Sequence, residues 1–426
     1  MWLNQRAKFL CLIGLFGFGV STIRAQQQAD IAYLCSEALS GRGYVDGGLN
    51  LAADYIAQEF EKAGLQPLHK GWFQPFRMSV NTFPSAMHVK VGERILVAGE
   101  DYLVKASSSS IHGSFRLRHI HLADLEKDEA FESLKREDLS RSILVLDTMS
   151  FSEDHIDKRY KQVQYNQLKA AGIIIKSKRN LIWTVARNKA VYFTLECKPE
   201  AINDGDTLIS LNVKSKFVKR FKAKNVWGIV PGTQYPDSFL FITAHYDHLG
   251  MMGENTMFPG ANDNASGTAM MLELARYYGK SPQPFSLVFI AFTAEEAGLV
   301  GSKHFTEHPP INLSKIRFLM NLDLEGTGID GITAVNATVF EEDFTTLLDV
   351  NEQGQYLSKL VRRGKAANSD HYWFTELGVP SFFLYQMGPY NHYHDPGDKP
   401  AGLPMDAFVP TQHLVIDFFT RLQAPN

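Results

Sequence analysis

This sequence of 426 residues has few cysteines, no long apolar run and no surplus of basic residues. Its three cysteines are too few for a disulfide-built scaffold. The formal net charge is −3, without the basic face that nucleic-acid binding requires, so we expect no nucleic-acid partner. What the chain does contain is 45% hydrophobic residues, enough for a large core, and its length predicts two or three domains.

The apolar run nearest the N-terminus, Phe9–Val20, spans only 12 residues. It follows Arg6 and Lys8, and a polar segment begins after Ala25, which is the pattern of a signal peptide. We therefore predict that residues 1–25 are removed and that the mature chain is exported to the periplasm or the cell exterior, with no stable membrane insertion. An uncleaved membrane anchor is the alternative. The sequence leaves open whether Cys35 and Cys197 pair after export.

The first half of the chain mixes helical and strand patterns. Residues 51–63 have apolar side chains at helical spacing and end at Gly64, which predicts an amphipathic helix. Residues 70–105 are typical of short strands joined by turns. Further on, from about residue 106 to 222, the pattern predicts a small strand-rich α/β module. Its expected elements are strands at Ile143–Leu146, Ile173–Ile175 and Leu181–Val185 and a helix over Tyr160–Ala171.

The last 200 residues alternate strands with helices. A helix is predicted over Ala265–Tyr278. Short β-rich apolar runs predict strands at Val226–Val230, Phe239–Thr243, Leu287–Phe292, Phe318–Leu322 and Ser381–Tyr385. Such alternation favours an α/β fold with three layers, in which helices cover both faces of a mostly parallel central sheet.

Imidazoles and carboxylates recur where these strands end. In open α/β sheets ligands bind beyond the carboxyl ends of the strands, so these side chains are expected to converge. The candidates are His245, Asp247, Asp263, Glu295, Glu296, Asp323, His392 and His394. Burying several carboxylates together is costly unless a cation neutralises them.

Charge and ligand type together favour two divalent cations. Imidazole and carboxylate ligands without thiolate suit zinc, with cobalt or manganese as substitutes. The carboxylates of Asp263, Glu296 and Asp323 carry three negative charges, whereas His245 and His394 are neutral. Two divalent cations with one bridging hydroxide bring the sum to zero, but a single cation leaves the site about two charges negative.

Each candidate residue also has a purely structural reading. A histidine paired with a carboxylate is common in protein cores, a Glu-Glu pair is usually a solvated turn, and Asp263 could cap a helix. His248, His371 and His392 are neighbouring alternatives to the chosen histidines. Five candidate ligands at successive strand ends together favour a metal site over these separate structural roles.

Six segments of the second half resemble the two-zinc aminopeptidases of metallopeptidase family 28. In order they are AHYDHLG, GANDNASG, TAEEAGLVGS, NLDLEG, SDHYWFTELGVPS and YHDPGD. After the predicted signal peptide at 1–25, the resemblance implies the N-terminal part of a catalytic domain at 26–105, an inserted protease-associated-like domain at 106–222 and the zinc peptidase domain proper at 223–426. The inserted domain is matched mainly through ILVLD and QLKAAGIIIK.

The resemblance also implies roles for individual residues. His245 and Asp323 would bind one zinc ion, Glu296 and His394 the other, and Asp263 both, with a cis bond between Asp263 and Asn264. Glu295 would act as general base towards a metal-bridging hydroxide. Asp247 would orient His245, and Tyr393 would help to hold the oxyanion. The family pattern has Thr after the last histidine, where this chain has Asp395.

The activity implied is the removal of N-terminal residues from peptides. Three alternatives share the fold: a glutaminyl cyclase, a carboxypeptidase and a catalytically inactive binding module. Glutaminyl cyclases use one zinc ion and lack the first histidine, whereas His245 is present here. A carboxypeptidase would need a positive group for the terminal carboxylate, and the sequence alone places none.

Overall fold

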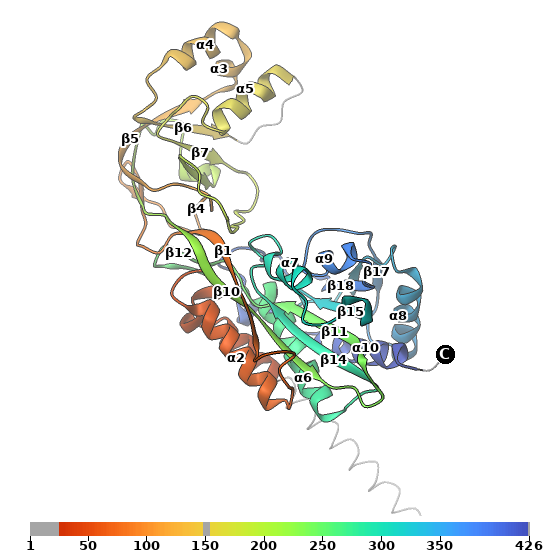
Figure 1. Cartoon of the computed structure of the whole chain (residues 1–426). Helices are drawn as coiled ribbons and strands as arrows, with labels where there is room; N and C mark the ends of the chain where they lie inside the picture. Colours follow the sequence, from red (N-terminus) through yellow and green to blue (C-terminus); the bar gives the residue numbers. More distant parts are fainter. Residues whose placement is uncertain (1–24, 148–153, 425–426) are drawn as a thin grey trace, which may run out of the picture.

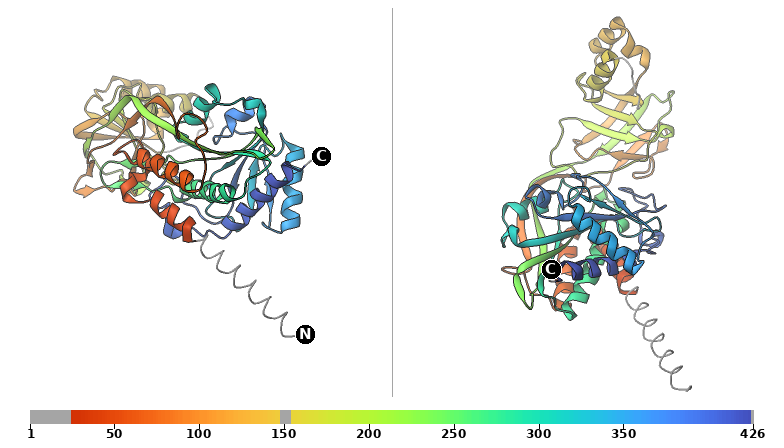
Figure 2. Two further views of the ribbon diagram at one scale, coloured as in Figure 1. Left: turned by 60° about the horizontal axis from the view of Figure 1, so that its bottom comes forward. Right: turned by 90° about the vertical axis from the view of Figure 1, so that its right-hand side faces the viewer.

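The computed structural model describes residues 25–147 and 154–424, so the predicted signal peptide lies outside the described residues except for Ala25. The molecule has two lobes, one above the other in the view of Figure 1 and again after a quarter turn in Figure 2. Each lobe is built on its own sheet of eight strands. Strands β1 (Phe73–Thr82) and β10 (Lys216–Val230) form a long antiparallel pair that leads the chain out of the lower lobe and back.

The lower lobe contains a mixed sheet with a parallel centre. Its strand order is β1-β10-β14-β11-β15-β18-β16-β17. The further members are β11 (Tyr235–His245), β14 (Phe285–Phe292), β15 (Ile316–Leu322), β16 (Ile332–Val335), β17 (Leu360–Arg362) and β18 (Ser381–Gln386). The pairs β14·β11, β11·β15 and β15·β18 are parallel, so their carboxyl ends meet at one edge.

Helices cover both faces of this sheet. Alternate residues of β11 point to opposite sides: Leu240 and Ile242 belong to one apolar cluster, and Phe239 and Phe241 to another. The first cluster includes residues of α2 (Gly48–Lys62), α6 (Gly267–Lys280), α8 (Glu341–Gly354) and α10 (Phe408–Leu422); the second includes residues of α7 (Val300–Glu307) and α9 (Tyr372–Glu376). The predicted three-layer α/β fold is confirmed.

The upper lobe contains the second large sheet, in the order β3-β2-β9-β5-β6-β7-β8-β4. Its strands are β2 (His88–Val91), β3 (Arg94–Ile95), β4 (Tyr102–Val104), β5 (Ile111–Ile120), β6 (Ser142–Asp147), β7 (Gly172–Lys176), β8 (Phe193–Cys197) and β9 (Leu208–Val213). One face packs against α3 (Leu122–Glu126), α4 (Asp128–Arg136) and α5 (Asp154–Gln164).

The upper sheet differs from the domain division drawn from the sequence. Strands β2, β3 and β4 precede residue 106, yet they belong to the upper sheet rather than to the catalytic one. The sheet changes directly after β1 because β1 pairs with β10, and the chain between these two strands builds the upper lobe.

Two predicted elements of the upper lobe are wrong in detail. The expected helix Tyr160–Ala171 is α5 instead, which ends at Gln164, and Asn166 and Lys169 after it have positive φ angles. The expected strand Leu181–Val185 joins neither sheet. Its apolar residues Leu181 and Trp183 are buried against the upper lobe's core without forming a strand.

Both cysteines of the described chain are free and buried, Cys35 in the core of the lower lobe and Cys197 in that of the upper lobe. The open question of their pairing is therefore answered for this structure. Among the described residues, no helix combines the length and apolarity that a bilayer crossing requires.

Candidate metal centre

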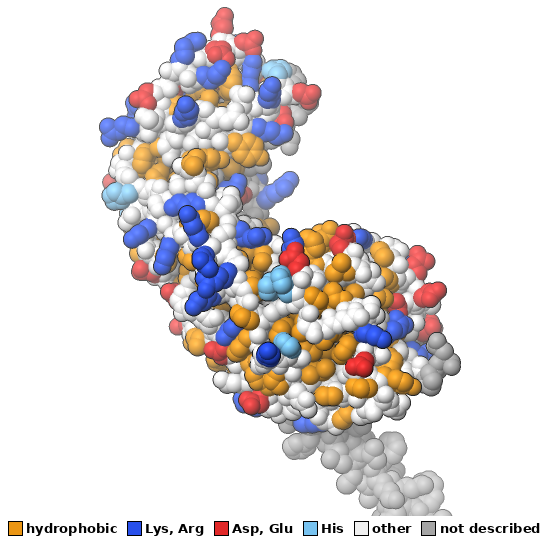
Figure 3. All heavy atoms as spheres, viewed as in Figure 1, with side chains coloured by type: hydrophobic (Ala, Val, Ile, Leu, Met, Phe, Trp, Pro, Cys, Tyr) orange, Lys and Arg blue, Asp and Glu red, His pale blue; other side chains and the backbone are white. Residues whose placement is uncertain are grey.

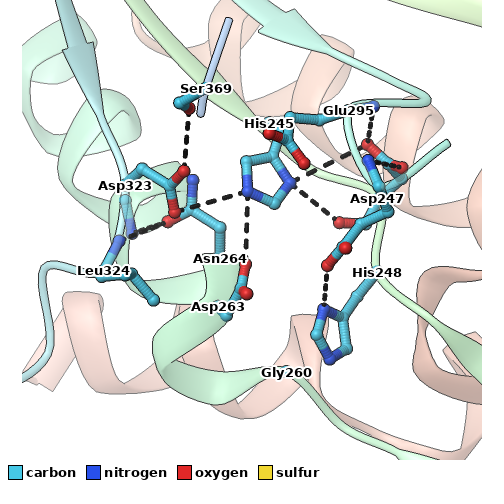
Figure 4. A network of polar contacts seen from close by, with 12 residues as sticks. His245, Asp247, His248, Gly260, Asp263, Asn264, Glu295, Asp323, Leu324 and Ser369 are labelled. Carbon is cyan, nitrogen blue, oxygen red and sulfur yellow. Dashed lines mark hydrogen bonds and ion pairs between the residues drawn. The ribbon is translucent and has the colours of Figure 1, made fainter. Parts of the chain in front are cut away.

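The predicted site lies at the carboxyl edge of the parallel strands. His245 is the last residue of β11, Asp323 directly follows β15, and the pair Glu295-Glu296 comes shortly after β14. Asp263 lies in the turn Ala261–Ser266 before α6. Because the three strands are parallel neighbours, their ends bring these side chains together, as Figure 4 shows.

One group of side chains surrounds the His245 imidazole. Its Nε2 atom lies 3.3 Å from Oδ1 of Asp263 and 3.4 Å from Oδ1 of Asp323. Oδ2 of Asp323 accepts a hydrogen bond of 2.8 Å from the Ser369 hydroxyl, whereas its buried Oδ1 has no hydrogen-bond partner. An unpartnered buried carboxylate oxygen facing an imidazole nitrogen and a second carboxylate fits a cation ligand.

A second group surrounds Glu296. The Nε2 atom of His394 lies 3.0 Å from Oδ2 of Asp263 and 3.2 Å from Oε2 of Glu296. The other carboxylate oxygen of Glu296, Oε1, lies 2.8 Å from Nδ1 of His248. Asp263 thus stands between the two groups, with one oxygen towards His245 and the other towards His394. The peptide bond between Asp263 and Asn264 is cis.

Ligand atoms lie close enough for metal binding in both groups. In the set His245, Asp263 and Asp323, and in the set His248, Asp263 and Glu296, ligand atoms lie within 4.8 Å of one another. Sequence reasoning named His248 only as an alternative, and the structure brings it to the same carboxylate as His394. His371 and His392 lie elsewhere: His371 is fully buried beside Phe383, and His392 contacts Asp395 at 3.0 Å.

The electrostatics of the cluster show strongly interacting groups. Although burial works against it, the charge of Glu296 raises the pKa of His394 to about 11. Burial likewise opposes the shift at Glu296, but His394 lowers the pKa of this carboxyl to about 2. His394 and Glu296 therefore hold each other in charged form. A divalent cation would take the place of those protons, so binding it would release them.

Asp247 lies beside His245, as expected, and also contacts the segment that carries the two glutamates. Oδ1 of Asp247 lies 3.8 Å from Nδ1 of His245, which is closer, at 3.1 Å, to the backbone oxygen of Asp247. The Asp247 carboxylate accepts hydrogen bonds from the Tyr44 hydroxyl at 2.6 Å and from the backbone N–H of Glu295 at 3.1 Å. Burial raises the pKa of Asp247 to about 6. The carboxylate thus fixes the backbone that carries the two glutamates.

Glu295 and Tyr393 both line the pocket in front of the cluster. Burial, with a further contribution from the charge of Glu296, raises the pKa of Glu295 well above its usual range. Tyr393 stacks on the His394 ring with 4.0 Å between ring centroids. The pocket has a volume of about 290 Å³, and its remaining lining is Leu324, Arg363, Asn368, Phe383 and Tyr385.

Three positioning contacts escaped the sequence analysis. Buried Arg42 donates hydrogen bonds to the backbone oxygens of Tyr246, Pro259 and Gly260, on the loops that carry His245 and Asp263. No sequence signal distinguishes this arginine from a surface one. The Asp398 carboxylate accepts hydrogen bonds from the backbone N–H of Asn262 at 2.8 Å and of Asp263 at 3.1 Å. Its place in the YHDPGD segment is the signal that could have found it.

The third contact comes from the upper lobe's part of the chain. The backbone oxygen of Trp183 lies 2.9 Å from Nδ1 of His394, and the backbone N–H of Trp183 donates to the oxygen of His394 at 3.0 Å. An oxygen at Nδ1 fixes the ring so that Nε2 faces the carboxylates. Sequence reasoning could not find this contact because residues 183 and 394 are far apart in the chain.

Comparisons with known proteins show which proteins this chain is similar to. Residues 225–419 match the model of peptidase family M28, which confirms the resemblance expected from the sequence. Aminopeptidase YwaD of Bacillus subtilis is 31% identical over 217 residues, which is 46% of this chain and 44% of that protein. A probable leucine aminopeptidase of Arthroderma otae is 27% identical over 230 residues, which is 50% of this chain and 60% of that protein. The chain thus spans about half the length of these curated relatives.

Solved structures share the fold over nearly the whole chain. BSAP, a zinc aminopeptidase from Bacillus subtilis, has a TM-score of 0.69 at 21% identity and covers 93% of this chain and 94% of its own. A peptidase M28 precursor from Shewanella amazonensis has a TM-score of 0.69 at 18% identity, and the match covers 95% of this chain and 96% of that one. Both lobes therefore share the fold of these solved structures.

Proposed function

We propose that this chain is an exported zinc-dependent exopeptidase, an aminopeptidase that hydrolyses N-terminal peptide bonds. The observation that carries the proposal is the position of Asp263, whose two oxygens face His245 on one side and His394 on the other. Relatives named as aminopeptidases, together with the match to peptidase family M28, support this reading over other hydrolases.

The donor set suits two zinc ions. His245 and Asp323 would hold one ion, Glu296 and His394 the other, and Asp263 both. When bound, zinc acts as a Lewis acid and lowers the pKa of water to near neutrality. His248, at 2.8 Å from Glu296, would orient that carboxylate. The unpartnered Oδ1 of Asp323 supports this assignment, because a buried acceptor requires a partner.

Glu295 would move the proton in the reaction. Its side chain lines the pocket beside His245 and Asp323, and its pKa is raised by burial. A carboxyl with a raised pKa can accept a proton from the attacking water and return it to the leaving amine near neutral pH. Tyr393, at the mouth of the same pocket, would donate its hydroxyl proton in a hydrogen bond to the developing oxyanion.

The experiment that tests the proposal measures release of p-nitroaniline from leucine p-nitroanilide. We expect turnover by the purified protein, loss of turnover with a chelator and recovery with added zinc. Glu295→Gln should lower kcat by about 10²- to 10⁴-fold, the usual contribution of a general base. Glu341→Gln, at an exposed position of α8, is the matched control and should keep wild-type kcat. Undiminished turnover in Glu295→Gln would refute the assigned base.

Blocked substrates separate an aminopeptidase from the other enzymes on this fold. An N-acetylated peptide should resist hydrolysis, while a peptide with an amidated C-terminus should be cleaved. The reverse result would indicate a carboxypeptidase, and cyclisation of an N-terminal glutamine would indicate a glutaminyl cyclase. Export is proposed from residues 1–25 and is compatible with a relative named as a probable lipoprotein aminopeptidase of Mycobacterium tuberculosis. Cell fractionation would test it.

A further inference from the structure

The pocket beside the candidate metal centre is also lined by an arginine, Arg363, that the proposed reaction does not use. Arg363 follows directly after β17, and its backbone N–H bonds to Ala334 of β16. Its side chain lines the same pocket of about 290 Å³ as His245, Asp263 and Asp323. Here is the positive group that the sequence alone could not place.

An aromatic wall positions this guanidinium. Phe383 and Tyr385 are two residues apart on β18, so both side chains point to the same face, with ring centroids 5.3 Å apart. Arg363 donates from Nη1 to the Tyr385 hydroxyl at 3.2 Å and lies 5.9 Å from the centre of that ring. A guanidinium has five N–H donors in a planar fork, so donors remain for a further partner.

Arg363 has no ion-pair partner among residues 25–147 and 154–424. Its neighbour Arg362, by contrast, lies over the Phe344 ring of α8 at 5.2 Å, outside the residues that line the pocket. Because successive side chains of an extended segment alternate, the two arginines point in different directions. One is a pocket residue and the other packs on a helix, although both are exposed to solvent.

The charge of the loaded pocket allows an anionic partner. Asp263, Glu296 and Asp323 carry three negative charges, which two divalent cations and one bridging hydroxide would balance. Arg363 adds one positive charge to the lining of the pocket. A cation is an unfavourable neighbour for the free amine of a peptide. Arg363 therefore suits another part of the substrate, and the partner that matches its fork is a carboxylate.

We propose that Arg363 selects substrates with a carboxylate next to the scissile residue. The proposal rests on the proposed peptidase function and names its substrate class. Two parts of a substrate can present such a carboxylate: the side chain of an N-terminal Glu or Asp, or the free C-terminus of a dipeptide. Arg363 is a specificity residue in either case and takes no part in bond cleavage.

The test compares matched substrates in wild type and in Arg363→Leu. One pair is glutamate and glutamine p-nitroanilide, and the other is Leu-Gly and its C-terminal amide. We expect Arg363→Leu to lower kcat/KM about tenfold for the carboxylate member of one pair, the size of a charge-assisted hydrogen bond near solvent, and to change the neutral member less than about twofold. The pair affected identifies the source.

Arg362→Leu is the matched control, because it removes an arginine one residue away whose side chain packs on α8. In both substrate pairs, this control should leave the ratio of kcat/KM between the carboxylate and the neutral member unchanged. The proposal would be overturned if Arg363→Leu lowered kcat/KM equally for the charged and the neutral member of each pair. It would also be overturned if the ratio of the two kcat/KM values stayed as in the wild type. Binding of the same ligands to zinc-loaded Glu295→Gln protein, with and without Arg363→Leu, gives a second readout without turnover. If the wild type hydrolysed none of these substrates, yet binding still distinguished the carboxylate ligand from the neutral one, the peptidase function would be refuted. The carboxylate site would stand.

Discussion

At the scale of single residues, the candidate metal centre depends on the buried side chain of Arg42, which is not one of the candidate ligands. Arg42 is fully buried, yet its partners are backbone oxygens rather than carboxylates. Four such oxygens accept from its guanidinium, at 2.6 to 2.9 Å, from residues Leu34, Tyr246, Pro259 and Gly260. The arginine thereby ties the N-terminal part of the chain to the loops that carry His245 and Asp263.

We predict that Arg42→Met lowers the free energy of unfolding by at least about 3 kcal/mol. Methionine retains much of the apolar bulk but leaves several buried oxygens without donors, and each such loss costs about 1–3 kcal/mol. Urea unfolding monitored by tryptophan fluorescence gives the value. Arg77→Met, at an exposed position of β1, should change stability by no more than about 0.5 kcal/mol. An unfolding midpoint for Arg42→Met equal to that of the control would contradict the prediction.

The convergence of two candidate ligand residues could be predicted because each one lies at the end of a recognisable strand. His245 and Asp323 terminate apolar runs, and parallel pairing of those runs brings them to one edge. Arg42 and Trp183 could not be predicted in the same way. Their contacts are made through backbone oxygens and fixed by tertiary structure, so the local sequence holds no record of them.

At the scale of elements, the segment between β7 and β8 links the two lobes beside the candidate metal centre. The Trp183 ring stacks on Phe258 with 4.7 Å between centroids, and its Nε1 donates to the oxygen of Val104 at 2.9 Å. These contacts hold the backbone that meets His394. The lobe with the second sheet is therefore part of the support of the site.

We predict that Trp183→Ala weakens zinc binding about tenfold, the lower end of the effect of losing a partner of a metal-bound histidine. The alanine variant keeps the backbone oxygen but loses the ring that fixes its position. Competition with a chelator of known affinity measures the zinc Kd.

Ile182→Ala is the control for this experiment, because the neighbouring isoleucine is 47% exposed. It should bind zinc as tightly as the wild type. An unchanged zinc Kd in Trp183→Ala would show that the segment does not support the ligand.

Periodicity located elements well where burial follows the strand or helix repeat. The predicted strand Leu287–Phe292 lies within β14, whose core positions are buried on both faces. Periodicity failed at Leu181–Val185, since Leu181 and Trp183 are buried in the core of the upper lobe but the segment makes no sheet pairing. The upper lobe's start was also misplaced, because β2 pairs with β9 more than 100 residues later in the chain.

At the scale of the whole molecule, Figure 3 shows the two lobes with a hollow between them on the face drawn. An ion network stabilises the side of the lower lobe that carries α2 and α6. Arg276 of α6 contacts Asp30 at 2.7 Å and Glu59 of α2 at 2.7 Å. Lys62 adds a contact of 2.7 Å to Glu59. This network joins three helical segments, since residues 25–34 are also helical.

The network predicts a loss of stability in acid. Although burial works against it, Lys62 and Arg276 lower the pKa of Glu59 below its ordinary value of 4.5. A lowered pKa in the folded state stabilises the protein above pH 4.5, and this stabilisation disappears as the pH falls through the folded value. We expect Glu59→Gln to be less stable than wild type near neutral pH by about 1 kcal/mol and to lose less stability on acidification.

Thermal unfolding from about pH 6 to about pH 3 checks this difference. Glu61→Gln, two residues along the same helix and exposed, is the matched control and should follow the wild-type pH profile. A Glu59→Gln variant whose pH profile also matches wild type would show that the network does not contribute to the acid sensitivity.

The central claim is a pair of cations sharing Asp263, and elemental analysis of the purified protein tests it most directly. We predict two zinc ions per chain after dialysis against metal-free buffer, and loss of both in Asp263→Ala, because that carboxylate faces both groups. One zinc ion per chain in the wild type, or an Asp263→Ala variant that keeps two, would contradict the shared centre.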